Sequence, residues 1–408
     1  MPWQPGELVV TLTAFVAFAC ILFGYYLLRP IRDAWAIERS ASDLRYFFLY
    51  TFAVMLVVLP LYWWLIERST RRRFLTVTFV TVSAATLVFA WLLSRDPSNV
   101  AGAASFFVFL SVINLFIVSV FWSVMADAFD REQAPRLFGF IAGGGSLGAI
   151  AGPALAAVLV GDLQPPALMA AAALMFLAAL AAIRRLLGLM PKRIANAGRS
   201  LIARDHPLTD LIAVVRSRYL LAIGIMLVIA QVAANLVYQE QARAVTASYG
   251  TLAERTALFA RIDLWVNLSA LALQLVIGHT LVRRIGFRAT LTLMPVIAAL
   301  SFLGLALVPT LSVLIVTQVV RRAGEYGLFR PARETLFTAV AESAKYRSKS
   351  LIDTVVHRGG DALGAIVHGG LTQLGLALPG LAAVGAGLCA ALIGLAAWIG
   401  KTFTASRL

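Results

Sequence analysis

Residues 138–160, FGFIAGGGSLGAIAGPALAAVLV, form an apolar run that contains no charged side chain. A transmembrane helix needs about 20 mostly apolar residues to cross the hydrocarbon core of a bilayer, so this run is long enough to span a membrane. Glycines recur at spacings of four, at Gly144, Gly148 and Gly152. Small residues at this spacing let two transmembrane helices approach closely, so the run predicts a tightly packed helix pair.

The rest of the chain shares this apolar character. Of its 408 residues, 60% are hydrophobic and 13% are charged, and the mean hydropathy is +0.85. These values indicate an integral membrane protein, and about 34 residues for each helix with its loop gives about twelve spans. The apolar runs lie at 8–28, 44–66, 74–94, 101–126, 138–160, 166–188, 219–238, 256–281, 289–308, 311–340, 350–376 and 379–400.

No hydrophilic stretch is long enough for a separate soluble domain, and the N-terminal residues lack the basic region of a secretory signal. The predicted fold is therefore all-α and polytopic, with twelve transmembrane helices in two six-helix bundles. We expect an N-terminal bundle of residues 1–189, a cytoplasmic linker of 190–218 and a C-terminal bundle of 219–408.

The net charge of +15 is explained by its distribution along the chain. Of the 35 Lys and Arg residues, 24 fall in segments predicted to be cytoplasmic and eight in outer segments, while Arg321, Arg322 and Arg358 lie within spans. This split follows the positive-inside rule and predicts that both termini are cytoplasmic. The basic excess therefore does not indicate a nucleic-acid partner.

The sequence contains no pattern typical of an enzyme or a cofactor site. The glycine-rich run is not a phosphate-binding loop, because no Lys-Ser or Lys-Thr pair follows it. Cys20 and Cys389 both fall in apolar spans, where buried thiols pack as small hydrophobic groups. No nucleophile with a base beside it and no metal-ligand spacing stands out, so we expect no catalytic residues, cofactor or metal ion.

The two halves resemble each other at an offset near 215 residues. A basic loop follows the second and the eighth spans, an acidic residue ends the fourth and the tenth, and a Gly-Ala-Ile motif recurs in the fifth and the eleventh. The matched pairs are 67–73 with 282–288, Asp127 with Glu342, and 148–150 with 364–366. A parallel duplication of this kind places a transporter's binding site near the bilayer midplane.

This six-plus-six duplication resembles the major facilitator superfamily. The segment Glu67-Arg68-Ser-Thr-Arg71 is similar to the superfamily's cytoplasmic loop motif, and Gly148 to Pro153 is similar to the fifth-span motif of its antiporters. The resemblance implies a monomer that works by alternating access. It also implies a conformational role for Glu67, Arg68, Arg71, Asp127, Gly148, Gly152 and Pro153.

Two further segments resemble the ATP/ADP translocase family, the bacterial and plastid nucleotide transporters of this superfamily. They are Leu28-Arg29-Pro-Ile-Arg32-Asp33 at the end of the first span, and residues 121–139 at the end of the fourth span and in the loop after it. The resemblance implies that Arg32, which stands where the family has lysine, contacts a substrate phosphate. It also implies a location in a bacterial inner (plasma) membrane.

Charged residues within or beside the spans are the candidate substrate ligands, because ionisable groups in the bilayer normally face a bundle interior or an aqueous path. Arg29 and Arg32 could bind an anion or could anchor the outer interface with a local Arg–Asp pair. Arg321 and Glu325 could pair in a cavity or could lie in an inner loop. The full candidate set is Arg29, Arg32, Asp33, Asn114, Asn235, Arg321, Arg322, Glu325 and Tyr326.

A second polar stripe runs along the eleventh span through Asp353, His357, Asp361, Gly364 and His368. Spacings of three and four keep these residues on one helix face. Imidazole groups titrate near neutral pH, so the stripe suits proton coupling. A gating ion pair of Asp361 with Arg358, or with the other half of the chain, is the alternative, and a metal site is the remaining one. The candidate coupling or gating residues are His357, Arg358, Asp361 and His368.

The leading hypothesis is a secondary active transporter that moves an organic anion, such as a nucleotide or a phosphorylated metabolite, by alternating access. The surplus of arginine over acidic residues along the cavity helices favours it. The alternative is a proton-coupled antiporter that exports a hydrophobic or cationic small molecule. In both cases the partners are a small-molecule substrate and the lipid bilayer.

Overall fold

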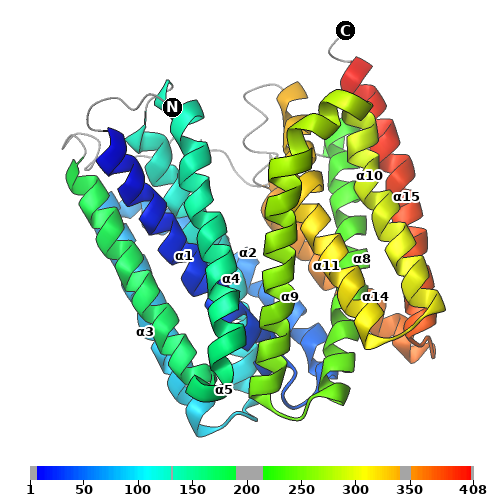
Figure 1. The fold of residues 1–408 in the computed structure, drawn as a ribbon, viewed down its shortest axis with the longest axis horizontal. Helices are drawn as coiled ribbons and strands as arrows, with labels where there is room; N and C mark the ends of the chain where they lie inside the picture. Colours follow the sequence, from blue (N-terminus) through cyan, green and yellow to red (C-terminus); the bar gives the residue numbers. More distant parts are fainter. Residues whose placement is uncertain (1–6, 130–131, 190–214, 341–350, 406–408) are drawn as a thin grey trace. The chain divides into compact units, whose positions relative to one another are not determined.

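The computed structural model describes residues 7–129, 132–189, 215–340 and 351–405, and all regular structure in them is helical (Figure 1). Most of the predicted linker (190–214), Glu342 and the side chain of Glu67 lie outside the described residues. The chain divides into two compact units, which we describe separately.

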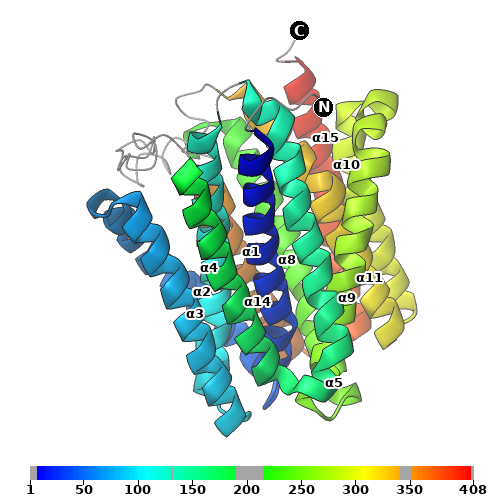
Figure 2. The ribbon, with the colours of Figure 1, turned by 60° about the vertical axis from the view of Figure 1, so that its left-hand side comes forward.

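The first unit comprises the described parts of Met1–Ser40, Ala53–Ile202 and Tyr249–Leu264. Its helices are α1 (Glu7–Ala36), most of α2 (Leu44–Arg68), α3 (Arg71–Arg95), α4 (Val100–Ala128), α5 (Gln133–Leu189) and the first part of α9 (Leu252–Ala272). α1 packs along α5 and α4, and α3 packs against α5 (Figures 1 and 2). The buried face of α4 is aromatic, with Phe106, Phe107 and Phe121 fully covered.

The 57 residues of α5 form two helical stretches that meet at Gln164. Gln164 has φ 58° and ψ 153°, outside the helical region, and Pro165 and Pro166 follow it. A proline disfavours the helical conformation of the residue before it, so this break is encoded locally. The chain reverses direction there (Figure 1), which brings both stretches back into the same unit.

The glycine-rich part of α5 lies directly against the backbone of α1, as the sequence predicts. A Cβ atom at Gly148 would collide with the carbonyl oxygen of Ala19 and would lie 2.8 Å from the amide nitrogen of Phe23. A Cβ atom at Gly152 would lie 2.7 Å from the carbonyl oxygen of Phe23. Only residues without a side chain allow this separation, so the close packing predicted from the glycine spacing is confirmed.

The second unit comprises the described parts of Ala41–Phe52, Ala203–Ser248 and Trp265–Leu408. Its α-helices are α8 (Arg218–Ser248), α10 (His279–Leu307), α11 (Leu311–Gly324), α12 (Arg330–Leu336), α14 (His357–Gln373) and α15 (Leu378–Ala405). It also contains the first part of α2 and the last part of α9. Three π-helical segments, η2 (Leu273–Gly278), η3 (Glu325–Phe329) and η5 (Ile352–Val356), and the short 3₁₀ turns η1 (Ala41–Asp43) and η4 (Phe337–Ala339) complete it.

α8 is the central helix of the second unit and contacts α14, α15 and α11 (Figure 1). Its contact with α14 again depends on glycine. A Cβ atom at Gly364 would lie 2.6 Å from the Cβ of Asn235, and one at Gly360 would lie 2.8 Å from the Cβ of Gln231. The glycine motifs that align between the two halves of the sequence therefore serve the same packing role, α5 on α1 and α14 on α8.

Nine helices among the described residues are long and apolar enough to cross a membrane, judged by length and composition. They include α1, α3, α4, α8 and α15, each with a mean hydropathy of 1.9 or more over an 18-residue window. The protein is thus an all-helical, polytopic membrane protein.

Gly148 provides a test of the close helix contact. We expect Gly148→Ala to lower the melting temperature of the purified protein, because overpacking of a tight contact costs about 1–3 kcal/mol. Gly139→Ala on the same helix is the matched control, since a Cβ there meets no atom within 4 Å. Equal melting temperatures for the two variants would contradict the prediction.

Candidate substrate-binding and coupling residues

Arg32 lies near the end of α1 and is buried with the residues that hold it. Its Nε donates to Asp33 Oδ1 at 2.8 Å, and its Nη1 donates to Ser111 Oγ of α4 at 3.3 Å. Its guanidinium also stacks over the ring of Phe107 at 4.6 Å. The local Arg–Asp pair that the sequence offers as an alternative is therefore present. Asn114, the next candidate along α4, is half-buried.

Arg29 lies one turn before Arg32 and has a different environment. Its Nη1 is 3.6 Å from Oδ1 of Asp263 on α9, and the Asp263 side chain is 2% exposed. The guanidinium also lies 6.0 Å from the centre of the Tyr26 ring. An arginine and a carboxylate removed from water together are held by strong mutual attraction, so α1 and α9 share a buried ion pair in the first unit.

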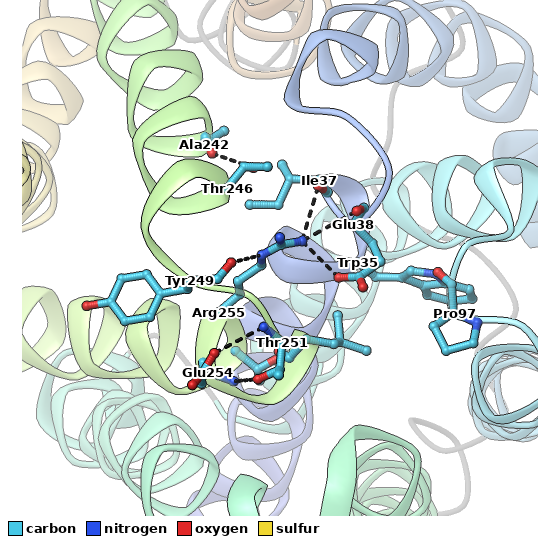
Figure 3. A network of polar contacts seen from close by, with 12 residues as sticks. Trp35, Ile37, Glu38, Pro97, Ala242, Thr246, Tyr249, Thr251, Glu254 and Arg255 are labelled. Carbon is cyan, nitrogen blue, oxygen red and sulfur yellow. Dashed lines mark hydrogen bonds and ion pairs between the residues drawn. The ribbon is translucent and has the colours of Figure 1, made fainter.

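Arg255, at the start of α9, forms a second connection to the end of α1 (Figure 3). Its Nε donates to the Tyr249 carbonyl oxygen at 2.9 Å, and its Nη1 donates to Glu38 Oε2 at 3.0 Å. A capping box fixes this end of the helix: the Thr251 amide donates to the Glu254 carboxylate, and the Glu254 amide donates to the Thr251 hydroxyl. The Arg255 side chain therefore lies against the segment that follows α1.

The predicted conformational motif is brought together in part. Arg71, at the start of α3, donates to the carboxylate of Asp127 at the end of α4. Arg68 is exposed at the end of α2. Gly148, Gly152 and Pro153 lie on α5, where Gly148 and Gly152 contact α1. A further ion pair joins Arg136 of α5 to the buried Glu7 of α1 at 2.8 Å.

The stripe on α14 faces α8 in the second unit. Asp361 accepts a hydrogen bond from Gln231 Nε2 at 2.7 Å and one from Arg358 Nη1 at 3.2 Å. His357 Nδ1 lies 3.6 Å from the same carboxylate. Asn235 donates to the backbone carbonyl oxygen of Asp361 at 3.2 Å. The predicted pair between Asp361 and Arg358 is therefore present, within a larger polar cluster.

His368 lies two turns further along α14, separated from that cluster. Its Nε2 is 2.7 Å from Glu240 Oε1 of α8, and the His368 side chain is 2% exposed. Arg243 Nη1 contacts the same carboxylate oxygen at 3.0 Å. A histidine, a carboxylate and an arginine thus converge at one point of the α8–α14 contact.

The candidates of the tenth predicted span lie on one nearly continuous helical segment, α11–η3–α12. Arg321 Nη2 donates to Gln318 Oε1 at 2.6 Å, one turn earlier, and not to Glu325 as the spacing suggested. Arg322 is buried, and Glu325 and Tyr326 are half-buried within η3. On α12, Arg333 is buried and pairs with Asp353 of η5 at 3.0 Å.

Sequence reasoning did not single out Asp263, Glu240 or Arg333. The available signal was an acidic or basic residue inside or at the end of an apolar span. The sequence does not show which residue forms the ion pair with each of these three. Arg29 and Asp263 are 234 positions apart, and Glu240 and His368 are 128 apart.

The helical architecture is similar to the fold of several solved transporter structures. The POT family transporter PepTSo matches with a TM-score of 0.70 and 12% identity over 99% of both chains. The nucleoside transporter NupG matches with a TM-score of 0.57 and 12% identity, also over 99% of both chains. A bacterial homologue of the human lysosomal transporter Spinster gives 0.57 and 12%, over 100% of this chain and 98% of that one.

Sequence comparison identifies the family. The model of the TLC ATP/ADP transporter family matches residues 203–406, half of the chain, and the protein belongs to this family. It is a membrane transporter and not an enzyme. No curated protein sequence matches significantly. The match confirms the family that the sequence resembles; residues 28–33 and 121–139, on which that resemblance was based, lie outside the matched range.

The Arg255 network gives a testable prediction. We expect Arg255→Ala to lower the melting temperature, because it removes the partner of Glu38 and leaves the Tyr249 carbonyl oxygen without its donor, at a cost of about 2–3 kcal/mol. Arg261→Ala, an exposed arginine on the same helix, is the control and should behave as wild type. A melting temperature unchanged by Arg255→Ala would show that the network does not stabilise the protein.

Proposed function

We propose that the protein exchanges ATP and ADP, or closely related phosphorylated metabolites, across a bacterial inner (plasma) membrane as a monomer that works by alternating access. The family match over residues 203–406 carries this proposal. The side chains support it, because α1 and α11 hold the guanidinium groups of Arg32 and Arg322 in buried positions and α1 holds that of Arg29 in a half-buried one. Guanidinium binds phosphate oxygens in pairs and keeps its charge when buried.

We further propose that the protein has twelve transmembrane helices, three more than the nine candidate spans. The break at Gln164 divides α5 into two stretches, each long enough to span a membrane. The segments α11–η3–α12 and η5–α14 supply two more, in which a π-helical turn adjoins an α-helix of only 14 residues in α11 and 17 residues in α14. The six spans of residues 1–189 and the six of residues 219–408 then form the two halves, with 190–218 and both termini in the cytoplasm.

Nucleotide counterflow tests the function directly. Proteoliposomes are preloaded with ADP, with phosphate or with buffer, and labelled ATP is added outside. We expect accumulation of label only with ADP inside, because an exchanger needs a substrate on both sides to complete its cycle. Accumulation that does not depend on the internal solution, or no accumulation by folded protein, would contradict nucleotide exchange.

Two arginine variants refine the same measurement. Arg29→Ala and Arg322→Ala should each reduce counterflow at least about tenfold, the loss expected when one charge-assisted contact to an anion, worth about 1.5 kcal/mol or more, is removed. Arg95→Ala, an exposed arginine at the end of α3, is the control. Full counterflow in both Arg29→Ala and Arg322→Ala would mean that neither guanidinium binds the substrate.

A second candidate function is coupling of transport to protons, including proton-driven export of a hydrophobic or cationic compound. The observation that favours it is the polar face of α14. Asp361, His357 and Arg358 cluster against Gln231, and His368 pairs with Glu240 at 2.7 Å. Buried carboxylate and imidazole groups in spans are the usual carriers of protons across a bilayer.

A pH gradient separates the two candidates. If transport is proton-coupled, an inward-acid gradient changes the rate of substrate movement in wild-type proteoliposomes, and Asp361→Asn or Glu240→Gln removes that response. Asp162→Asn, an exposed carboxylate, should retain it. A wild-type rate that is the same with and without the gradient would reject proton coupling and leave pure exchange.

A further inference from the structure

Two arginines lie one turn apart at the end of α1, and each faces a carboxylate, but the two pairs differ in kind. Asp33 is the sequence neighbour of Arg32 and moves with it on the same helix. Asp263 reaches Arg29 from α9, a different part of the chain. The inference below rests on the proposed function, namely that the substrate is an anion.

Arg32 is fully engaged by short contacts. Asp33 Oδ1 accepts from both Nε and Nη2, at 2.8 and 2.5 Å, and Ser111 accepts from Nη1 at 3.3 Å. The Phe107 ring covers one face of the guanidinium at 4.6 Å. A substrate phosphate that reached Arg32 would have to break several charge-assisted bonds to a carboxylate that cannot leave.

The contact between Arg29 and Asp263 is looser. The 3.6 Å between Nη1 and Oδ1 is an ion-pair distance and exceeds the usual range of an N–H···O hydrogen bond. α9 passes from the first unit into the second at Trp265, two residues after Asp263. Unlike Asp33, Asp263 is not tied to α1 by the backbone of the same helix, so it is the carboxylate that can part from its arginine.

We propose that Asp263 is a resident counter-anion, which neutralises Arg29 in the unloaded transporter and gives it up to a phosphate group of the entering substrate. Arg29, and not Arg32, is then the guanidinium that accepts the anion. Phosphate and carboxylate compete for the same donors of a guanidinium, and an arginine buried in a span needs one of them at all times. A neutral molecule cannot replace Asp263, so the pair selects for charge.

Ligand binding to the purified full-length protein tests this. Apparent Kd values for ATP, ADP, inorganic phosphate and uncharged adenosine would be compared between wild type, Asp263→Asn and Asp263→Glu. We expect Asp263→Asn to bind the anions about tenfold more tightly, because their competitor is gone, and adenosine no differently. Asp263→Glu restores a carboxylate and should return the anion affinities toward wild type. In proteoliposomes, Asp263→Asn should lower the KM and the kcat of exchange together, since a more tightly bound anion must climb a higher barrier in the later steps and is released more slowly.

Glu38→Gln is the matched control. It removes the carboxylate from the other ion pair between α1 and α9, the one with Arg255, without touching Arg29. Tightening of anion binding by Glu38→Gln to the same extent would mean that loosening of α1 from α9 is the cause, and would overturn the proposal. Anion binding by Asp263→Asn that equals or falls below wild type would overturn it as well.

A neutral double variant covers the case in which Asp263→Asn does not fold. Arg29→Gln with Asp263→Asn replaces the ion pair by two amides, and it should lose anion binding although Arg32 remains. Wild-type affinity in this variant would overturn the proposal. The proposal that the substrate is a nucleotide can fail on its own. If the wild-type protein binds phosphate but neither ATP nor ADP, the nucleotide is rejected as substrate. If Asp263→Asn then binds phosphate more tightly than wild type, the role of Asp263 as counter-anion is still supported.

Discussion

The close contact between α5 and α1 is the constraint on which the first unit depends. Gly148 and Gly152 bring the two backbones so near that no side chain fits between them. In a bilayer, where lipid is as apolar as leucine, such van der Waals contact supplies much of the attraction between helices. It also fixes the rotation of α1, because only one face of that helix can meet the glycines. Arg29 and Arg32 are placed by that rotation, and each meets a carboxylate within the unit.

In the second unit, glycines likewise allow α14 to pack closely against α8, and polar side chains interact at that contact. Gly360 and Gly364 let α14 approach Gln231 and Asn235 of α8. The same approach allows Asp361 to accept from Gln231, and allows His368 to reach Glu240. Polar groups inside a span are costly unless they are hydrogen-bonded, so the tight helix contact and the polar cluster require each other. Each unit thus contains a helix pair whose close contact depends on glycine, α5 with α1 in the first and α14 with α8 in the second.

The sequence predicted the apolar parts of the spans well, and it predicted less well the helix ends that contain paired charged residues. The run 8–28 predicted α1, but the helix continues to Ala36. Its last turns contain Arg32 and Asp33, whose mutual bonds keep polar side chains buried inside a helix. α8 likewise extends beyond the predicted 219–238 to Ser248, through Glu240 and its bonds to His368 and Arg243. A prediction from hydropathy places the end of a span at the first charged residues. It cannot take into account the distant residues that pair with those charges and allow the helix to continue.

Because the sequence does not show which distant residues pair, it could predict only those contacts of the candidate site that lie within one helix. Helical spacing predicted that Asp361 and Arg358 meet, since they belong to one helix, and it identified the glycine faces. It could not connect Arg29 with Asp263, because nothing in either segment records the other. A buried arginine nevertheless implies a buried anion, since a lone guanidinium in a span is too costly to persist. Where such an arginine belongs to a transporter of anions, its resident carboxylate is also the group against which the substrate must compete. The three-dimensional pairing therefore adds something that the motif around Arg32 does not contain: the identity of the group that the substrate displaces.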